Sequence, residues 1–169
     1  MLFRSAGSTV AQAWQTTQLK PLWTAPIPDP DLYSILRVSP VANALLIASA
    51  TGSHAVLDAR SGAVIGIPRK SILKEAAIDE FGRQLAAAEF APDGSYFATA
   101  AGGLPVQCWK TETGYPVGAG IPVTGQVTAI GFRPDGNLLA VSESTGLCSL
   151  WNTPEDRKST RLNSSHLVI

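Results

Sequence analysis

The sequence is poor in cysteine, histidine and charge. Its 169 residues include two Cys, two His and 13 side chains of each charge sign, and charged residues make up only 15% of the chain. Two cysteines do not form a disulfide framework. A sparse and balanced charge excludes a disordered acidic or basic chain and a nucleic-acid-binding protein that relies on bulk charge.

Long apolar runs are also missing from the sequence. No stretch of about 18 apolar residues is present, so no segment is predicted to span a membrane. Residues 1–20 carry Arg4 and three Gln without a continuous apolar run, which predicts no secretory signal. Together with the two unpaired cysteines, these absences favour a cytoplasmic location.

What the sequence contains is an internal repeat. Segments 90–94 and 132–136 share the pattern Phe-x-Pro-Asp-Gly and lie 42 residues apart. Seventeen residues after the proline of each segment stands a tryptophan, Trp109 or Trp151. Such self-similarity at a fixed period is the signature of a repeat architecture.

Two further copies are less regular. Pro40 is followed, again after seventeen residues, by Leu57 instead of a tryptophan. The segment that ends at Trp14 matches the segment that ends at Trp109, so a fourth copy, truncated at its front, is expected at the start of the chain. The repeated positions are Trp14, Leu57, Trp109, Trp151, Pro40, Pro92, Asp93, Gly94, Pro134, Asp135 and Gly136.

Each copy predicts four short strands. Residues 91–94 have Pro at the second and Gly at the fourth position, which is typical of a type I turn. Residues 127–132 and 147–151 alternate as strands do, and 138–141 form an apolar run of strand length. The prolines of 115–122 restrict that segment to a sheet edge. A β-sandwich with accidental internal similarity is the alternative.

The unit resembles the WD-repeat family of β-propellers, whose period is about 40–45 residues with one four-stranded blade per repeat. Trp109 and Trp151 stand where the tryptophan of the family's Trp-Asp pair would be, and the style of the repeats resembles bacterial arrays. The Gly-His pair that opens a family repeat is missing. The family also has a structural Asp in the turn between second and third strands, and Thr51, Gly103 and Thr145 stand at that position here. The family's buried Asp-His network is therefore not expected, and apolar packing is expected to hold the blades together.

The resemblance implies an all-β fold: a partial β-propeller of four-stranded antiparallel blades, about three blades plus part of another. The chain is expected to be an interior fragment of a longer propeller. The expected segments are the end of a truncated blade (2–28), a blade (33–68), an inserted loop (69–84), a blade (85–122) and a truncated blade (127–155).

The end of the chain differs from everything before it. Residues 156–166 read DRKSTRLNSSH, which is polar and without apolar periodicity. This string resembles the translation of a widely used sequencing adapter. Residues 156–169 are therefore interpreted as an artefact tail and kept out of the fold prediction.

The inserted loop makes one connection between copies longer than the others. It spans sixteen residues, Arg69 to Gln84, where the other connections have four. A helical turn is expected near Lys74–Ala77. One interpretation is a projection that binds a partner, because long loops on rigid scaffolds often bind; the other is a tolerated insertion without a role. The charged residues of the possible partner-binding loop are Arg69, Lys70, Lys74, Glu75, Asp79 and Glu80.

Catalytic and metal-binding interpretations find little support in the sequence. His54 is the one histidine outside the tail, and it lies near the start of a predicted strand. Cys108 and Cys148 are expected to be free thiols, since a metal site needs more ligands. Asp93 and Asp135 are turn residues of successive copies. No catalytic residue, cofactor or metal is therefore predicted.

The resemblance implies a non-catalytic scaffold that binds protein or peptide partners, without nucleic acid or membrane. The alternative is a regulatory or sensor propeller of a larger signalling enzyme, such as a bacterial protein kinase, although the chain carries no kinase motif. A periplasmic or peptidase-associated propeller shares the Pro-Asp-Gly turn, but the repeated Trp favours the WD type. A catalytic propeller with a channel metal would need His and carboxylates that the predicted first strands almost wholly lack.

Overall fold

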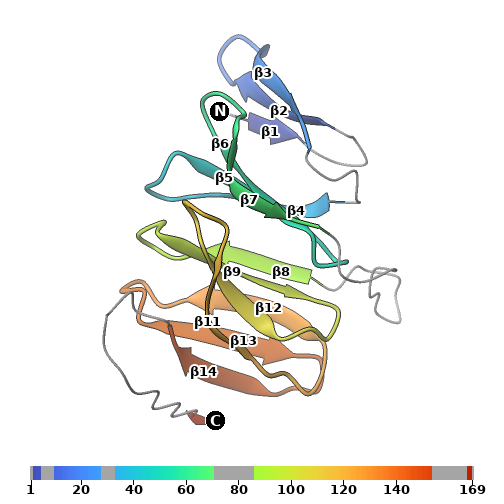
Figure 1. Ribbon diagram of the computed structural model, residues 1–169, viewed down its shortest axis with the longest axis vertical. Coiled ribbons are helices and arrows are strands. Elements are labelled where there is room, and N and C mark those ends of the chain that lie inside the picture. Colours follow the sequence, from blue (N-terminus) through green and yellow to red (C-terminus); the bar gives the residue numbers. More distant parts are fainter. Residues whose placement is uncertain (1, 5–9, 28–32, 71–85, 154–166, 169) are drawn as a thin grey trace.

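The computed structural model describes residues 2–4, 10–27, 33–70, 86–153 and 167–168 (Figure 1). Over these residues the chain forms strands and turns and no helix. The strands are β1 Leu2–Arg4, β2 Val10–Gln15, β3 Lys20–Pro26, β4 Tyr33–Val38, β5 Ala44–Ser49, β6 His54–Asp58, β7 Val64–Arg69, β8 Ala86–Phe90, β9 Tyr96–Ala101, β10 Val106–Lys110, β11 Pro116–Ile121, β12 Val127–Phe132, β13 Leu138–Glu143, β14 Cys148–Asn152 and β15 Leu167–Val168.

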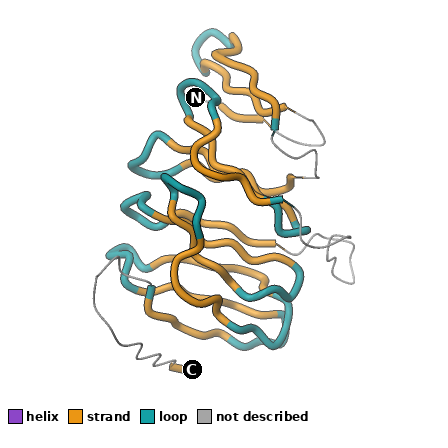
Figure 2. The backbone as a smooth tube through the Cα atoms, in the orientation of Figure 1, coloured by secondary structure: helices purple, strands orange, loops and turns teal. Residues whose placement is uncertain are grey.

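The strands form four antiparallel sheets, each in chain order. The first sheet is β1-β2-β3, the second β4-β5-β6-β7, the third β8-β9-β10-β11 and the fourth β12-β13-β14-β15. Figures 1 and 2 show them stacked face to face from the N-terminal to the C-terminal end of the chain. The expectation of an all-β chain built from four-stranded antiparallel sheets is confirmed. The described residues form an open stack and no closed ring.

The opening strands of neighbouring sheets lie closest to one another, because β8 contacts both β4 and β12. The last strand of each complete repeat lies at a sheet edge, as β7 and β11 do. The edge position predicted for the proline-bearing segment 115–122 is therefore confirmed by β11. In the fourth sheet this edge place is taken by β15, which pairs with β14 through Leu167 and Val168.

The Pro-Asp-Gly segments form the predicted turns between opening and second strands. Gly94 N donates to Ala91 O at 2.9 Å, and its φ of +70° suits the glycine at this position. Asp93 Oδ1 accepts a hydrogen bond from Ser95 N at 3.0 Å. Gly136 and Asp135 repeat both bonds in the fourth sheet, at 2.8 Å and 3.0 Å. The side chains of these aspartates therefore serve their own turns.

The turn at Pro40 has a different sequence but is closed by the same backbone hydrogen bond. Ser39 N donates to Ala44 O at 2.9 Å, and Ala91 N and Arg133 N each make the corresponding bond at 2.9 Å. Ser39 Oγ also accepts from Ala42 N at 3.0 Å. A serine hydroxyl thus takes over the capping that aspartate provides in the other two turns.

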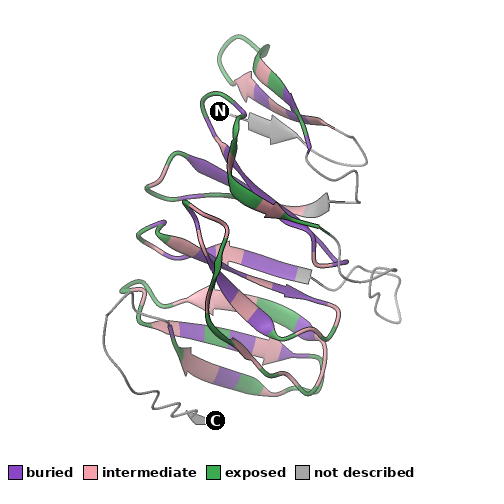
Figure 3. Ribbon diagram, in the orientation of Figure 1, coloured by how far each residue is buried: buried purple, intermediate pink, exposed green. Residues whose placement is uncertain are grey.

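The core lies between the sheets, in three apolar clusters (Figure 3). Leu57 packs with Ala11 of the first sheet and with Ile27, which directly follows β3. Trp109 packs with Leu46 and Val56 of the second sheet. The shared repeat position therefore faces the preceding sheet each time.

Trp151 continues this pattern in the fourth sheet. It packs against the cluster that contains Ala98, Val106 and Cys108 of the third sheet. Its indole Nε1 donates to Ser149 Oγ at 2.8 Å, and that of Trp109 donates to Thr99 Oγ1 at 2.8 Å. The repeat position of Leu57, Trp109 and Trp151 is thus the position that joins one sheet to the preceding one.

Candidate functional site

One edge of the stack carries the described connection between the third and fourth sheets, together with the turns between second and third strands. We call its described part, residues 50–53, 102–105, 122–126 and 144–147, the connection edge. Ser144 N donates to Gln126 O at 2.8 Å, and Gln126 N donates to Ser144 Oγ at 3.2 Å. These bonds place a connection and a turn side by side.

Glu143 holds the connection 122–126 in place. Its side chain is buried, and Oε2 accepts hydrogen bonds from Thr124 N at 2.9 Å, Thr124 Oγ1 at 3.0 Å and Gly125 N at 2.5 Å. Burial by itself would raise the pKa of Glu143, but the hydrogen bonds from Gly125 and Thr124 outweigh it and lower the pKa below its usual value. Glu143 is therefore a structural carboxylate at neutral pH.

Nothing in the sequence singles out Glu143, because an acidic residue at a strand end usually faces solvent. The corresponding position of the second sheet is Ser49. Ser49 Oγ lies 2.8 Å from Thr51 Oγ1 and 2.7 Å from Ser53 Oγ, and all three residues are buried. Polar contacts therefore help to hold this edge, in addition to the apolar packing that the sequence predicts.

An ion pair joins the opening strands of the second and third sheets. Arg37 Nε on β4 lies 3.3 Å from Glu89 Oε2 on β8, and the two side chains are 45% and 40% exposed. The residues stand 52 apart, at the same repeat position, which Gly131 occupies in the fourth sheet. Because such exposed pairs contribute at most about 1 kcal/mol, the pair is a marker of register more than a source of stability.

His54 is buried between the second and third sheets, with 1% of its surface exposed. Its ring centroid lies 4.5 Å from that of Trp109 and 5.2 Å from that of Phe97. Neither ring nitrogen has a hydrogen-bond partner among the described residues. Burial, assisted by the charge of Arg69, lowers the pKa of His54 to about 3. At neutral pH this histidine is therefore uncharged.

Two residues of the predicted partner-binding loop are described, Arg69 and Lys70. Arg69 ends β7, and its guanidinium carbon lies 4.8 Å from the ring centroid of Trp109, a cation–π contact. Lys70 is exposed. The other four charged residues of the loop, and the helical turn expected near them, lie outside the described residues. The contact with Trp109 fixes the place where the inserted loop leaves the second sheet.

The remaining titratable residues that the structure describes do not assemble into one site. Asp93 and Asp135 serve separate turns; Arg133, and the backbone of Asn137, lower the pKa of Asp135 to about 2. Cys108 is a buried free thiol whose pKa burial raises to about 12, whereas Cys148 is free and exposed. Among the described residues, no three His, Cys, Asp or Glu side chains gather as metal ligands would.

Comparison with known proteins does not assign the chain to a family. No model of a protein family matches the chain, and no curated protein is significantly similar to it. Within the described ranges, no helix is long and apolar enough to cross a membrane.

Proposed function

We propose that the protein is a non-catalytic scaffold of the WD-repeat β-propeller type, and that its connection edge binds a protein or peptide partner. The observation that carries this proposal is the recurrence of one packing position. Leu57, Trp109 and Trp151 each join their sheet to the preceding one, and the opening strands β4, β8 and β12 lie together. Stacked four-stranded sheets with inner opening strands are what a propeller requires.

The connection edge suits a binding surface because hydrogen bonds with buried side chains hold its loops in one conformation. Glu143 fixes Thr124 and Gly125, and the hydroxyl cluster of Ser49 fixes Thr51. Loops held by a rigid scaffold are the usual place for binding residues, and anchored loops lose less conformational entropy when a partner binds.

The chemistry of the edge indicates the kind of partner. The exposed residues of its described part are small and uncharged, and they include Gly103, Pro105, Thr124 and Thr145. Such a surface can recognise a ligand by its shape and by hydrogen bonds from hydroxyl and backbone groups. It therefore favours an uncharged peptide segment recognised by hydrogen bonds over an acidic or basic ligand recognised by charge.

A peptide library displayed on phage tests the proposal on the intact chain. Selected peptides are synthesised, and their Kd is measured by fluorescence polarisation. Thr145→Arg and Pro105→Arg place a bulky charge on the connection edge and are expected to raise Kd at least about tenfold. Glu112→Arg, in the exposed turn at the opposite edge, is the matched control and should leave Kd unchanged. A library that yields no binder, or peptides insensitive to the edge variants, contradicts the proposal.

The inserted loop is proposed as a second contact for the same partner. Arg69 is fixed on Trp109, so the loop starts from a defined point next to the connection edge. Replacing residues 71–84 by a Gly-Ser linker of equal length, with Arg69 retained, should weaken partner binding without unfolding the stack. Unchanged Kd values for all selected peptides would favour a tolerated insertion instead.

A further inference from the structure

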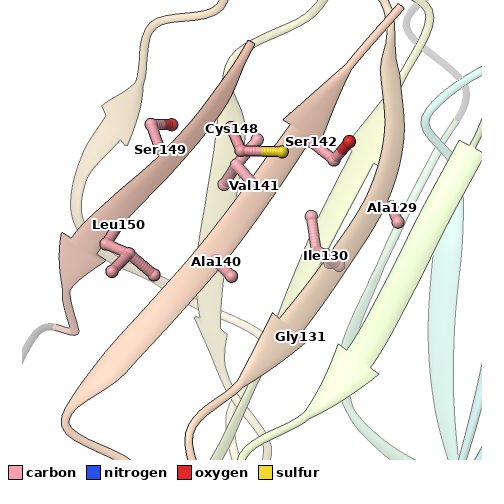
Figure 4. Close-up of a pocket in the computed structure, with 9 residues that line it drawn as sticks. All are labelled: Ala129, Ile130, Gly131, Ala140, Val141, Ser142, Cys148, Ser149 and Leu150. Carbon is pink, nitrogen blue, oxygen red and sulfur yellow. The ribbon is translucent and has the colours of Figure 1, made fainter. Parts of the chain in front are cut away.

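The face of the fourth sheet that points away from the third is apolar, and no described sheet covers it. We call this the outer face; it is formed by Ala129, Leu138, Ala140, Ser142, Cys148 and Leu150. Figure 4 shows the groove over β12, β13 and β14, which has a volume of about 330 Å³ and is lined in part by these side chains. β15 pairs with the edge of β14 and so extends the sheet sideways.

The repeat shows what covers this face elsewhere in the stack. Ala140 is exposed, but the same repeat position is Leu46 in the second sheet and Ala98 in the third, and both are 0% exposed. Leu46 is covered by Phe90 and Phe97 of the third sheet. The face that these residues share is therefore built to receive another sheet.

A second position gives the same result. Cys148 is exposed, and the same repeat position is His54 in the second sheet and Val106 in the third, each with 1% of its surface exposed. His54 contacts Trp109 of the following sheet. The occupant that the outer face lacks is thus a sheet that presents an aromatic residue at the Trp109 position.

The opposite end of the stack presents such a sheet. Trp14 on β2 stands at the repeat position of Leu57 and Trp109, which are 0% and 5% exposed because each packs on the preceding sheet. Trp14 is only half-buried, and no described sheet precedes it. Gln12 and Thr24 lie on this face and are joined at 3.3 Å, and Leu22 beside them is 48% exposed.

We propose that the outer face of the fourth sheet binds the first sheet of a second copy of this chain, with Trp14 seated against β13 and β14. The contact is head-to-tail, because the two faces belong to opposite ends of the stack. Two copies joined in this way bring together eight sheets, within the range of four to eight blades in closed propellers. This interaction is separate from partner binding at the connection edge.

Sedimentation velocity across a concentration series measures the association. Ala140→Lys puts a charge on the outer face, and Trp14→Ala removes the residue that fills it. Each variant is expected to weaken self-association by about 30-fold, the effect of losing an interface hot spot. Val41→Lys, at a turn residue that is 68% exposed, is the matched control and should associate like the unmodified chain. Far-UV circular dichroism establishes that each variant is folded.

Mixing the two variants distinguishes this geometry from any other. Ala140→Lys keeps an intact first sheet, and Trp14→Ala keeps an intact outer face, so the mixture should form a heterodimer at a concentration at which each variant alone is monomeric. Alkylation of Cys148 by iodoacetamide should slow in the mixture, because the thiol is then covered. A mixture that stays monomeric, or Cys148 that reacts equally fast at every concentration of the unmodified chain, overturns the proposal. The Kd of the selected peptides for Ala140→Lys is an independent measurement, because this variant leaves the connection edge unchanged. Failure of the self-association proposal is therefore distinguishable from failure of the peptide-binding proposal.

Discussion

The imidazole of His54 and the indole of Trp109 pack against each other across the interface between consecutive sheets, with ring centroids 4.5 Å apart and planes inclined by 57°. His54 opens β6, and Trp109 lies near the end of β10. Arg69, next to His54 in the strand register, covers the same indole. One histidine without a hydrogen-bond partner among the described residues therefore sits at the centre of a sheet-to-sheet contact.

This contact predicts that stability falls in mild acid. The pKa of His54 is about 3 in the folded chain against an ordinary value of 6.5, so between these values the unfolded chain binds a proton that the folded chain does not. Stability is full above the ordinary pKa and decreases as pH drops below it, with a limiting slope of about 1.4 kcal/mol per pH unit. Urea unfolding between about pH 5 and pH 7 measures this slope, in a range where carboxylates contribute little.

Replacement of His54 isolates its contribution to that slope. His54→Leu keeps an apolar side chain in the interface and should flatten the dependence of unfolding free energy on pH. His166→Gln changes the only other histidine of the chain and should leave the slope intact. An unchanged slope in His54→Leu would show that the imidazole is not buried as described.

Leu19 predicts a stabilising substitution. It is the one described non-glycine residue with a positive φ, +51°, and it is 71% exposed. The corresponding turns of the second and third sheets have Gly62 at +76° and Gly114 at +73°. Because the left-handed conformation costs a side chain about 1 kcal/mol, Leu19→Gly should raise the free energy of unfolding by about that amount. A lower denaturation midpoint would contradict this account of the turn.

Substitution of Gly114 by alanine is expected to lower the free energy of unfolding. A Cβ at this position would lie 2.3 Å from the carbonyl oxygen of Ile67, and the two segments are joined by the 3.0 Å bond from Ile67 N to Thr113 O. Gly114→Ala therefore adds strain at a positive φ and pushes the second and third sheets apart. We expect a loss of about 2 kcal/mol in chemical denaturation. Gly103→Ala, also at positive φ but with no atom near its Cβ, is the control and should cost less.

Glu143 predicts a local effect at the connection edge. Glu143→Gln keeps the shape but removes the charge that accepts from Thr124 and Gly125, so stability at neutral pH should fall by about 2 kcal/mol. Since the pKa of Glu143 is lowered in the folded chain, the stabilisation is present above its ordinary pKa and lost as pH falls through the folded value. The difference between the two chains should therefore shrink in acid.

Hydrogen exchange tests where this effect arises. The amide of Gly125 should exchange faster in Glu143→Gln, while the amide of Gly94, in a turn at the opposite edge, should keep its rate. Equal exchange of Gly125 in both chains would mean that the carboxylate does not hold the connection.

Much of the fold could be predicted because the repeat is carried by local signals. The turns at Gly94 and Gly136 require residues with special backbone preferences, and the position shared by Trp109 and Trp151 recurs at a fixed distance from them. Local turn chemistry and the constant spacing from proline to the Trp position thus predict the strands, their order in each sheet and the edge position of β11. Leu19 could also have been identified, since the repeat aligns it with glycines.

The polar and aromatic contacts described above could not be predicted, because they join side chains that lie far apart in the sequence. Glu143 meets Thr124 across a turn and two strands, and Arg37 meets Glu89 across 52 residues. The environment of His54 depends on Trp109 of the next sheet. Sequence patterns indicate which face of a strand is apolar, but they do not show which polar side chain closes a particular edge.

Nuclear Overhauser effects from the tryptophan indoles test the central claim most directly, that one repeat position joins each sheet to the preceding one. The account predicts cross-peaks between the Trp109 indole and the methyl groups of Leu46 and Val56 in the second sheet. It also predicts cross-peaks between the Trp151 indole and the methyls of Val106 in the third sheet. Cross-peaks confined to residues of each tryptophan's own sheet would contradict the stacked arrangement, and with it the proposed scaffold.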